Sequence, residues 1–183
     1  MKTRPNEPAI DERAHLNMEE LDQRLRGLKK ERSKRLQKIV QRQSDGSRLE
    51  PSKAYFSPKE GLHGDRWFKS KAKKGEQIAI MDTEVASIFA NGQSLTLFGD
   101  NLFLDLDLAE TLWPAGARFQ LGEVIFEISS DPHDGCSKFA KRFGKAALRK
   151  TCKAKALRLR GVYAFVIQEG WIEVGANVLD LQC

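Results

Sequence analysis

Short apolar runs, several of them alternating with polar residues, dominate the chain from residue 77 onward. Successive side chains of a β-strand point to opposite faces, so such runs are typical of strands that are buried on one or both faces. Turn-like stretches such as Leu121-Gly122-Glu123, Glu169-Gly170 and Gly175-Ala176 separate them. We therefore predict strands over residues 77–81, 95–98, 118–121, 124–129, 162–168, 171–174 and 177–181.

Helical spacing of apolar residues is confined to three segments, residues 18–32, 83–90 and 137–152. Before the first helix, Asn17 stands in the N-cap position and Glu20 in the matching capping-box position. The second helix is predicted to end at Asn91-Gly92, a sequence that favours the left-handed conformation that ends helices. The third helix is strongly basic.

The stretch between the first helix and residue 77 is less regular. Ile39 and Val40, followed by Ser44-Asp45-Gly46-Ser47, are typical of a strand that enters a hairpin turn. After Pro51 we predict a loop that continues to about Lys74. Many short strands with few helices favour a mainly β, antiparallel, barrel-like domain with a few short helices over a doubly wound sheet.

The first seventeen residues differ from the rest. Residues 1–17 are polar, contain Pro5 and Pro8 and show no apolar period, so we predict a flexible tail there. Residues 18–183 then form one domain that includes the N-terminal helix. Deletion of residues 1–17 should leave thermal stability nearly unchanged.

Composition excludes several classes of protein. Hydrophobic residues make up 40% of the chain and include ten Phe, which is enough for a core. No long uncharged apolar run predicts a transmembrane helix, and the charged first thirty residues do not resemble a secretory signal. The spacing of Cys136, Cys152 and Cys183 fits neither a zinc knuckle nor a disulfide framework. We expect a cytoplasmic protein with reduced thiols and no membrane partner.

The net charge of +6 is unevenly distributed. Residues 24–42 hold nine Lys or Arg against one acid, and residues 138–160 hold ten against none. Residues 82–134, between them, hold ten acids against one Arg. Such segregation indicates an anionic partner, either a phosphate-bearing small molecule or a nucleic acid. For the N-terminal run, a solvated face is an equally good interpretation.

The segment around Cys136 is the candidate reactive site. A predicted strand ends before it, Pro132 and Gly135 shape a tight loop, and Cys136 stands where the next helix begins. Helix N-termini carry partial positive charge and unpaired backbone N–H groups, both of which stabilise a thiolate. His133, three residues upstream, can assist by proton transfer or by contact with a ligand.

Neighbouring charges act on this sulfur in both directions. Lys138, Lys141 and Arg142 add positive potential, whereas Asp134 opposes thiolate formation. The alternative interpretation is that Cys136 is a buried structural residue and His133 a hydrogen-bonded loop histidine. Cys152 also has basic neighbours but lacks the position after a strand and loop.

Five segments, in order over about residues 36–181, resemble a known family. Gly61-Leu62-His63-Gly64-Asp65-Arg66-Trp67 is similar to a G-L-x-G-D-R motif, and Phe98-Gly99-Asp100-Asn101-Leu102 to a G-E-N-L motif. Residues 107–122 resemble the stretch that leads through an L-P-x-G turn into a strand. Residues 132–144 resemble a cysteine motif, and residues 157–178 the closing R-G-x-x-A and G-D-x-V elements. These motifs belong to small, stand-alone bacterial members of the MOSC domain family, which is named after the C-terminal domain of molybdenum cofactor sulfurases.

The resemblance implies a β-barrel-like fold and a link to molybdenum cofactor or to sulfur transfer. Cys136 would be the ligand of the metal or the carrier of a persulfide sulfur. Residues that would bind the cofactor, by their positions in the motifs, are Arg66, Asn101, Lys138, Arg142, Arg158 and Arg160. Relatives such as the mitochondrial amidoxime-reducing component reduce N-hydroxylated compounds, so a small-molecule substrate of that kind is one expectation. The chain departs from the family pattern at Asp100, Asp134 and Ala176.

Two functions from different classes follow. The first is a molybdenum-cofactor protein, which would need a separate reductase or sulfur donor because the chain has no four-cysteine set and no flavin motif. The second is a non-enzymatic basic module that contacts nucleic acid or another anionic ligand. Against nucleic acid, the aromatic residues are not interleaved with the basic ones as a stacking surface requires.

We predict that Cys136 is the most readily alkylated of the three cysteines, because reactivity follows thiolate fraction and access. Iodoacetamide labelling rates, resolved by residue with mass spectrometry, measure this directly. Asp134→Thr should increase the rate at Cys136, since a negative charge is removed. A slow Cys136 beside a fast Cys152 would contradict the assignment.

Overall fold

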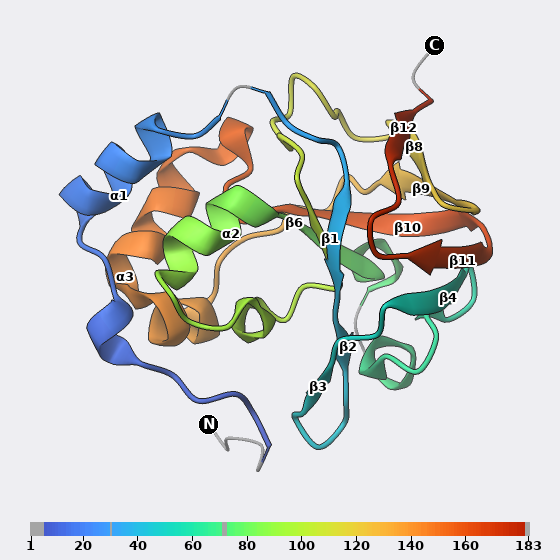
Figure 1. The fold of residues 1–183 in the computed structure, drawn as a ribbon, viewed down its shortest axis with the longest axis horizontal. Coiled ribbons are helices and arrows are strands. Elements are labelled where there is room, and N and C mark those ends of the chain that lie inside the picture. Colours follow the sequence, from blue (N-terminus) through green and yellow to red (C-terminus); the bar gives the residue numbers. More distant parts are fainter. Residues whose placement is uncertain (1–5, 30, 71–72, 182–183) are drawn as a thin grey trace.

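The computed structural model describes residues 6–29, 31–70 and 73–181 and shows a curled sheet with helices gathered against one side (Figure 1). The main sheet has the strand order β1-β7-β6-β10-β9-β8-β12. Its members are β1 (Leu36–Ile39), β6 (Ile78–Asp82), β7 (Leu102–Leu104), β8 (Arg118–Leu121), β9 (Val124–Ile128), β10 (Val162–Gln168) and β12 (Val178–Asp180). An antiparallel bridge from Arg35 to Asn177 brings the two edge strands together, so the sheet is nearly closed.

Two smaller strand sets complete the β part. Strands β4 (Lys53–Ser57), β5 (Gly61–Leu62) and β11 (Gly170–Glu173) form a three-stranded sheet in the order β11-β4-β5. Strands β2 (Gln41–Arg42) and β3 (Arg48–Leu49) form the predicted hairpin, in which Gln43 N–H donates to the Ser47 carbonyl. The mainly β, barrel-like fold predicted from the strand pattern is therefore confirmed.

The helices form a second layer. They are α1 (Met18–Arg26), α2 (Thr83–Ala90) and α3 (Ser137–Lys153), with single-turn 3₁₀ helices η1 (Glu12–Ala14), η2 (Arg66–Lys69), η3 (Lys74–Glu76), η4 (Leu95–Phe98) and η5 (Lys155–Leu157). The predicted capping box of Asn17 and Glu20 is present, and α2 ends at Asn91 in the left-handed conformation. Among the described residues, no helix has both the length and the apolar character that crossing a membrane requires.

Apolar residues fill two spaces, one inside the curled sheet and one between the sheet and the helices. On β9 alternate residues are buried, and the buried ones belong to the interior cluster. All five residues of β6 are buried, because Ile78 and Ile80 face the interior while Met81 packs with the helices. Contact on both faces explains why this strand is continuously apolar.

The structure differs from the local predictions in four places. Residues 95–98 form η4 rather than a strand, with the Ser94 side chain accepting a hydrogen bond from Thr96 N–H and with Gly99 in the left-handed conformation. The predicted loop after Pro51 contains β4, and β7 was missed. Strands β6 and β7 also run parallel, in a sheet whose other pairs are antiparallel. Four-residue apolar runs do not distinguish a strand from a helical turn.

Residues 6–17 pack against the domain, unlike the flexible tail that the sequence predicts over residues 1–17. Residues 1–5 lie outside the described part of the chain. Leu16 is buried, and Ile10 packs on the same helical core. The His15 ring covers Gly144, which interrupts α3 with φ of 91°, and His15 Nε2 lies 3.1 Å from the Arg142 carbonyl oxygen. The sequence did not predict this packing, because the segment is mostly polar and only isolated apolar residues, Ile10 and Leu16, contact the core.

Leu16→Ala should lower the free energy of unfolding by about 2 kcal/mol, because it removes a buried side chain at the edge of a core. Urea unfolding followed by circular dichroism measures the change. Glu12→Ala, at an exposed position of the same segment, should shift it by less than about 0.5 kcal/mol. Contrary to the expectation from sequence, deletion of residues 1–17 should lower the melting temperature; an unchanged value would show that the segment adds nothing to stability.

Candidate ligand-binding site around Cys136

Cys136 lies where the sequence places it, at the N-cap of α3, after a loop that leaves β9. Its backbone is extended, with φ of −122° and ψ of −179°, and its carbonyl accepts the first helical hydrogen bond, from Ala140 N–H. The residue is exposed, so the interpretation as a buried structural cysteine is wrong. The thiol stands at the positive end of a helix dipole.

Cys136 borders a cavity of about 160 Å³. The charged residues that line it are five arginines and one lysine, Arg42, Arg48, Arg66, Arg142, Arg160 and Lys138. The rings of Phe98, Phe139 and Phe143 form an apolar wall, with Phe98 and Phe143 stacked at 4.1 Å between centroids. Positive charge beside an apolar wall attracts an anion strongly, because the surroundings screen it less than water does.

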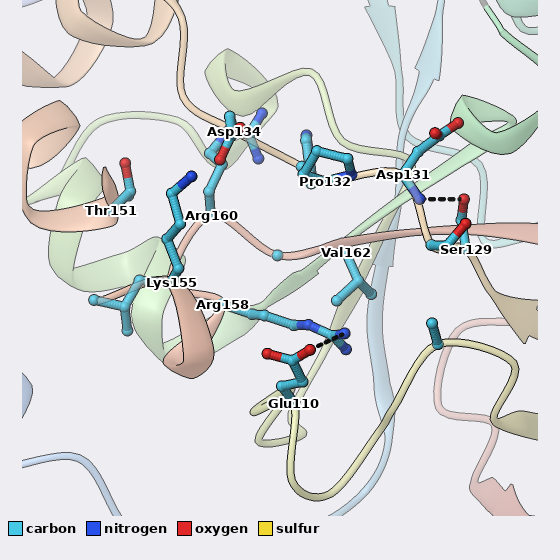
Figure 2. Close-up of a pocket in the computed structure, with 15 residues that line it drawn as sticks. Glu110, Ser129, Asp131, Pro132, Asp134, Thr151, Lys155, Arg158, Arg160 and Val162 are labelled. Carbon is cyan, nitrogen blue, oxygen red and sulfur yellow. Dashed lines mark hydrogen bonds and ion pairs between the residues drawn. The ribbon is translucent and has the colours of Figure 1, made fainter. Parts of the chain in front are cut away.

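Six of the eight residues predicted from sequence line this cavity: Cys136, His133, Arg66, Lys138, Arg142 and Arg160. Arg158 does not. It lines a neighbouring cavity of about 250 Å³, where one of its nitrogens donates to the Trp113 carbonyl and another lies 4.0 Å from Glu110. Figure 2 shows this second cavity, which shares His133 and Arg160 with the first. Arg158 follows η5 in the left-handed conformation, with φ of 47°, and its side chain belongs to this second cavity.

Asn101 does not line the cavity either. It is fully buried; its amide donates to the Val40 carbonyl and to Asp65, and its side-chain oxygen accepts from Ala79 N–H. All the hydrogen-bonding groups of its amide are therefore used inside the protein. Asn101 therefore stabilises the position of Asp65 through its hydrogen bond and is not available to a ligand.

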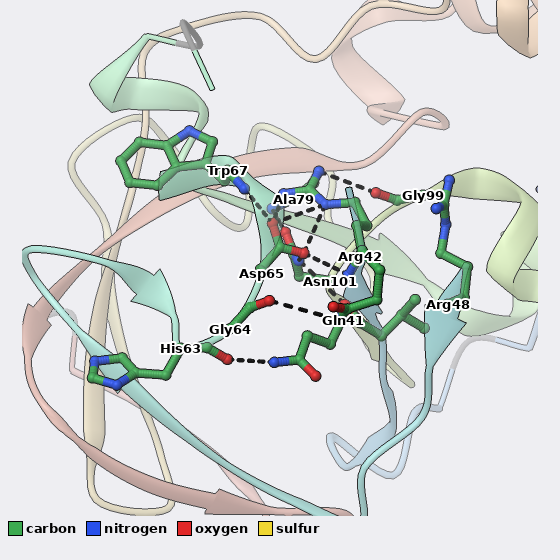
Figure 3. A network of polar contacts seen from close by, with 12 residues as sticks. Gln41, Arg42, Arg48, His63, Gly64, Asp65, Trp67, Ala79, Gly99 and Asn101 are labelled. Atoms are coloured by element: carbon green, nitrogen blue, oxygen red, sulfur yellow. Dashed lines mark hydrogen bonds and ion pairs between the residues drawn. The ribbon is translucent and has the colours of Figure 1, made fainter. Parts of the chain in front are cut away.

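Asp65 organises one wall of the cavity (Figure 3). Its buried carboxylate accepts hydrogen bonds from the Arg42 backbone N–H at 2.7 Å and from the Arg42 guanidinium at 2.8 to 3.2 Å. It also accepts from Trp67 N–H and from the Asn101 amide. Arg42 in turn donates to the Gly99 carbonyl at 3.2 Å. A guanidinium held at both ends keeps a defined position even before a ligand binds.

Asp100 holds Arg160 and lies near His133, two residues that line the cavity. The fully buried Asp100 carboxylate accepts two hydrogen bonds from Arg160 Nη1, at 2.8 and 3.0 Å. The His133 ring packs on Tyr163 at 4.0 Å between centroids, and its Nδ1 lies 3.6 Å from Asp100, too far for a good hydrogen bond. Burial, together with Arg160 and Arg42, lowers the pKa of His133 well below 6.5. His133 is therefore a neutral imidazole at pH 7.

Two further arginines converge on Gly99. A Cβ atom at Gly99 would lie 3.9 Å from both Arg142 Nη1 and Arg48 Nη2. The absence of a side chain there leaves the space between these guanidinium groups open, and φ of 76° favours glycine independently. Arg42 reaches the carbonyl of the same residue. Three arginines, from β2, β3 and α3, thus surround one backbone turn.

Arg42, Arg48 and Tyr163 are the polar residues of the cavity that sequence reasoning missed. The two arginines flank the predicted hairpin turn, and Arg42 falls within the basic run that was interpreted equally well as a solvated face. A solvated face is the wrong interpretation for Arg42, which pairs with the buried Asp65. It is also wrong for Arg32, because the Arg32 side chain is 6% exposed and lies near Asp82, Glu84 and Asp105. The signal that could have identified Arg42 and Arg48 is their position on the two strands of one short hairpin, which places both guanidinium groups in the same region.

A wider pocket of about 370 Å³ adjoins the cavity and shares Arg42, Arg66 and Tyr163 with it. In the part of the chain that the structure describes, Arg66 Nη1 and Trp67 Nε1 are buried without a hydrogen-bond partner, and no carboxylate pairs with Arg66 or Lys138. Buried donors without partners are rare and indicate a missing acceptor. Within the same residues, no three His, Cys, Asp or Glu side chains are grouped to hold a metal ion.

Comparison with known proteins gives a family and a fold. The family model of the MOSC domain matches residues 63–179. A search of the curated proteins found no match. The structure is similar to that of YuaD from Bacillus subtilis, with a TM-score of 0.58 and 16% identity, covering 79% of this chain and 93% of that one.

It is also similar to two structures of YiiM. For YiiM from Escherichia coli the TM-score is 0.57 and the identity 20%, covering 81% of this chain and 70% of that one. For YiiM from Geobacillus stearothermophilus the values are 0.56 and 19%, covering 80% and 75%. At this level of identity, the likeness concerns the fold alone.

The neutral state of His133 gives a testable pH dependence. Because the pKa of His133 is lower in the folded protein than in the unfolded chain, its contribution to stability is present above pH 6.5 and is lost as the pH falls below that value. His133→Phe keeps a ring on Tyr163 and should flatten the fall in melting temperature between pH 7.5 and 5. His63 lies outside the cavity, so His63→Phe should show the same fall in melting temperature as the unsubstituted protein. Equal slopes in H133F and the unsubstituted protein would contradict a neutral His133.

Proposed function

Because this chain belongs to the MOSC domain family, we propose that it binds molybdenum cofactor, with Cys136 as the protein ligand of the metal or as the carrier of a sulfur atom. One observation carries the proposal: an exposed thiol at the start of α3 borders a cavity lined by six cationic side chains. A thiolate suits a soft metal or a persulfide sulfur. Guanidinium groups suit a phosphate.

The residues present fit such a cofactor. The described residues offer no cluster of three metal-ligating side chains, and a molybdenum bound through a pterin brings its own sulfur ligands, so a single cysteine is enough. The buried, unpartnered Nη1 of Arg66 and Nε1 of Trp67 border the adjoining pocket. They supply donors for the polar groups of a pterin and its phosphate.

Each residue then has a defined task. Cys136 supplies the sulfur, while Arg42, Arg48 and Arg142 around Gly99 hold an anionic group. His133 can donate a hydrogen bond to a ligand from one ring nitrogen and accept one at the other, since the imidazole is neutral. When bound, the cofactor would supply redox chemistry for the reduction of N-hydroxylated compounds or would receive sulfur. A separate reductase or sulfur donor would be its partner.

Binding of nucleic acid is the second candidate, favoured only by the basic runs. The rings in the cavity wall, Phe98, Phe139 and Phe143, are each less than 5% exposed. Bases that stack on a protein need accessible ring faces, so this arrangement favours a small anionic ligand. Binding of single-stranded DNA that falls steeply with salt would instead support the nucleic-acid function.

Protein purified from a host that makes molybdenum cofactor should contain molybdenum and pterin. Cys136→Ser should lose most of the molybdenum, because Cys136 supplies the one thiolate among the described residues that line the cavity. Metal analysis by mass spectrometry and fluorescence of the oxidised pterin measure the two components separately. Cys152→Ser is the matched control and should retain both. Absence of both components from the unsubstituted protein would contradict cofactor binding.

A further inference from the structure

The segment that precedes η1 contacts both the β2–β3 hairpin and α3, two elements that carry arginines of the cavity. Asn6 Nδ2 donates a hydrogen bond of 2.9 Å to Asp45 in the turn of the β2–β3 hairpin. The carboxylate of the next residue, Glu7, lies 3.7 Å from Arg142 Nη2 on α3. Figure 1 shows the segment running from η1 toward the hairpin. Two consecutive residues therefore join two sides of the cavity, because the hairpin carries Arg48 and α3 carries Arg142.

Both attachment points are well defined. Asp45 also accepts hydrogen bonds from the backbone N–H and hydroxyl of Ser47, which fix its carboxylate in the hairpin turn. The Arg142 side chain is only 12% exposed, and Cys136 is close enough to act on it electrostatically. Glu7 thus places a negative charge among the cations that surround Cys136.

We propose that residues 6–10 form a strap that an anionic ligand displaces, with the Glu7 carboxylate occupying the place at Arg142 that a phosphate group takes. The inference rests on the proposed function only in requiring that the ligand carry a phosphate. It adds a regulatory element to that site. The strap is built into the chain and competes with the ligand for one guanidinium.

The contacts of the strap are weaker than those of residues 11–17, so the strap can move while residues 11–17 stay folded. At 3.7 Å the Glu7–Arg142 pair is longer than a charge-assisted hydrogen bond, and Glu7 is 25% exposed. A phosphate offers more charge and more acceptor oxygens, and it can contact Arg142 and Arg48 together over Gly99.

The base of the strap is held more firmly. Asp11 N–H donates to Gln93 at 2.9 Å, the Gln93 amide donates to the Arg142 carbonyl, and Leu16 is buried. Residues 11–17 therefore remain in place while residues 6–10 move, and this movement also separates the half-buried Ile10 from the helical core against which it packs.

Alkylation of Cys136 with a neutral and an anionic reagent tests the strap in the full-length protein without cofactor. Iodoacetamide and iodoacetate rates are each divided by the rate for a free thiol. Glu7→Gln should raise the iodoacetate rate at Cys136 roughly two- to fivefold, because one nearby negative charge is removed, and should leave the iodoacetamide rate within about twofold. Glu12→Gln, at an exposed acid of the same segment with no ion pair among the described residues, should change neither rate.

A second measurement follows the strap itself. Inorganic pyrophosphate, used as the phosphate probe, should increase hydrogen–deuterium exchange in residues 6–10 and leave residues 18–26 unchanged. Asn6→Ala removes the hairpin contact and should lower the pyrophosphate concentration needed for half of this effect.

The outcomes separate the two proposals. If Cys136 of the unsubstituted protein shows no preference for iodoacetate relative to a free thiol, and pyrophosphate does not slow its alkylation, the anion-binding site of the proposed function fails. If both effects are present but Glu7→Gln alkylates at the same rates as the unsubstituted protein, the proposal of a strap is wrong. The same holds if hydrogen exchange in residues 6–10 does not respond to pyrophosphate. In either case the anion-binding site of the proposed function is unaffected.

Discussion

The buried carboxylate of Asp65 holds the candidate site together. A charge this deeply buried is tolerated only when its oxygen atoms are paired, and here the partners come from three separate parts of the chain: Arg42 on β2, the Trp67 backbone in η2 and the Asn101 amide before β7. Asp65 therefore fixes the hairpin, the η2 turn and the main sheet relative to one another. The cavity beside Cys136 exists because these elements meet.

Charge compensation in the cavity is incomplete. Asp65 and Asp100 each pair closely with one arginine, and Glu7 pairs more loosely with Arg142. Arg66 and Lys138 have no carboxylate partner among the described residues, and the imidazole of His133 stays neutral because burial and the surrounding cations oppose its protonation. Like charges held together in partly dry surroundings repel one another. An anion of suitable size is the physical complement of such a site.

Several motif residues that resemble the MOSC family have structural tasks in this chain. A side chain at Gly161 would place its Cβ atom 2.0 Å from the Ile80 carbonyl oxygen, so the close approach of β10 to β6 requires glycine. Asn101 and Asp65 support the cavity wall from within. Motif similarity thus identifies the elements that build the site, whereas two of the arginines that line the cavity, Arg42 and Arg48, lie outside the motifs.

The sequence by itself determined the barrel-like β fold, the helix that begins after Cys136 and most of the cationic residues near it, because alternation, capping and turn residues are local signals. It could not place Arg158, which lines the neighbouring cavity and donates to the Trp113 carbonyl, or Asn101, whose burial depends on partners from Val40, Asp65 and Ala79. It also misjudged residues 6–17, where Leu16 and His15 are held by contacts with α3 and its helical neighbours. Only the tertiary structure decided these points, because each depends on residues far apart in the chain.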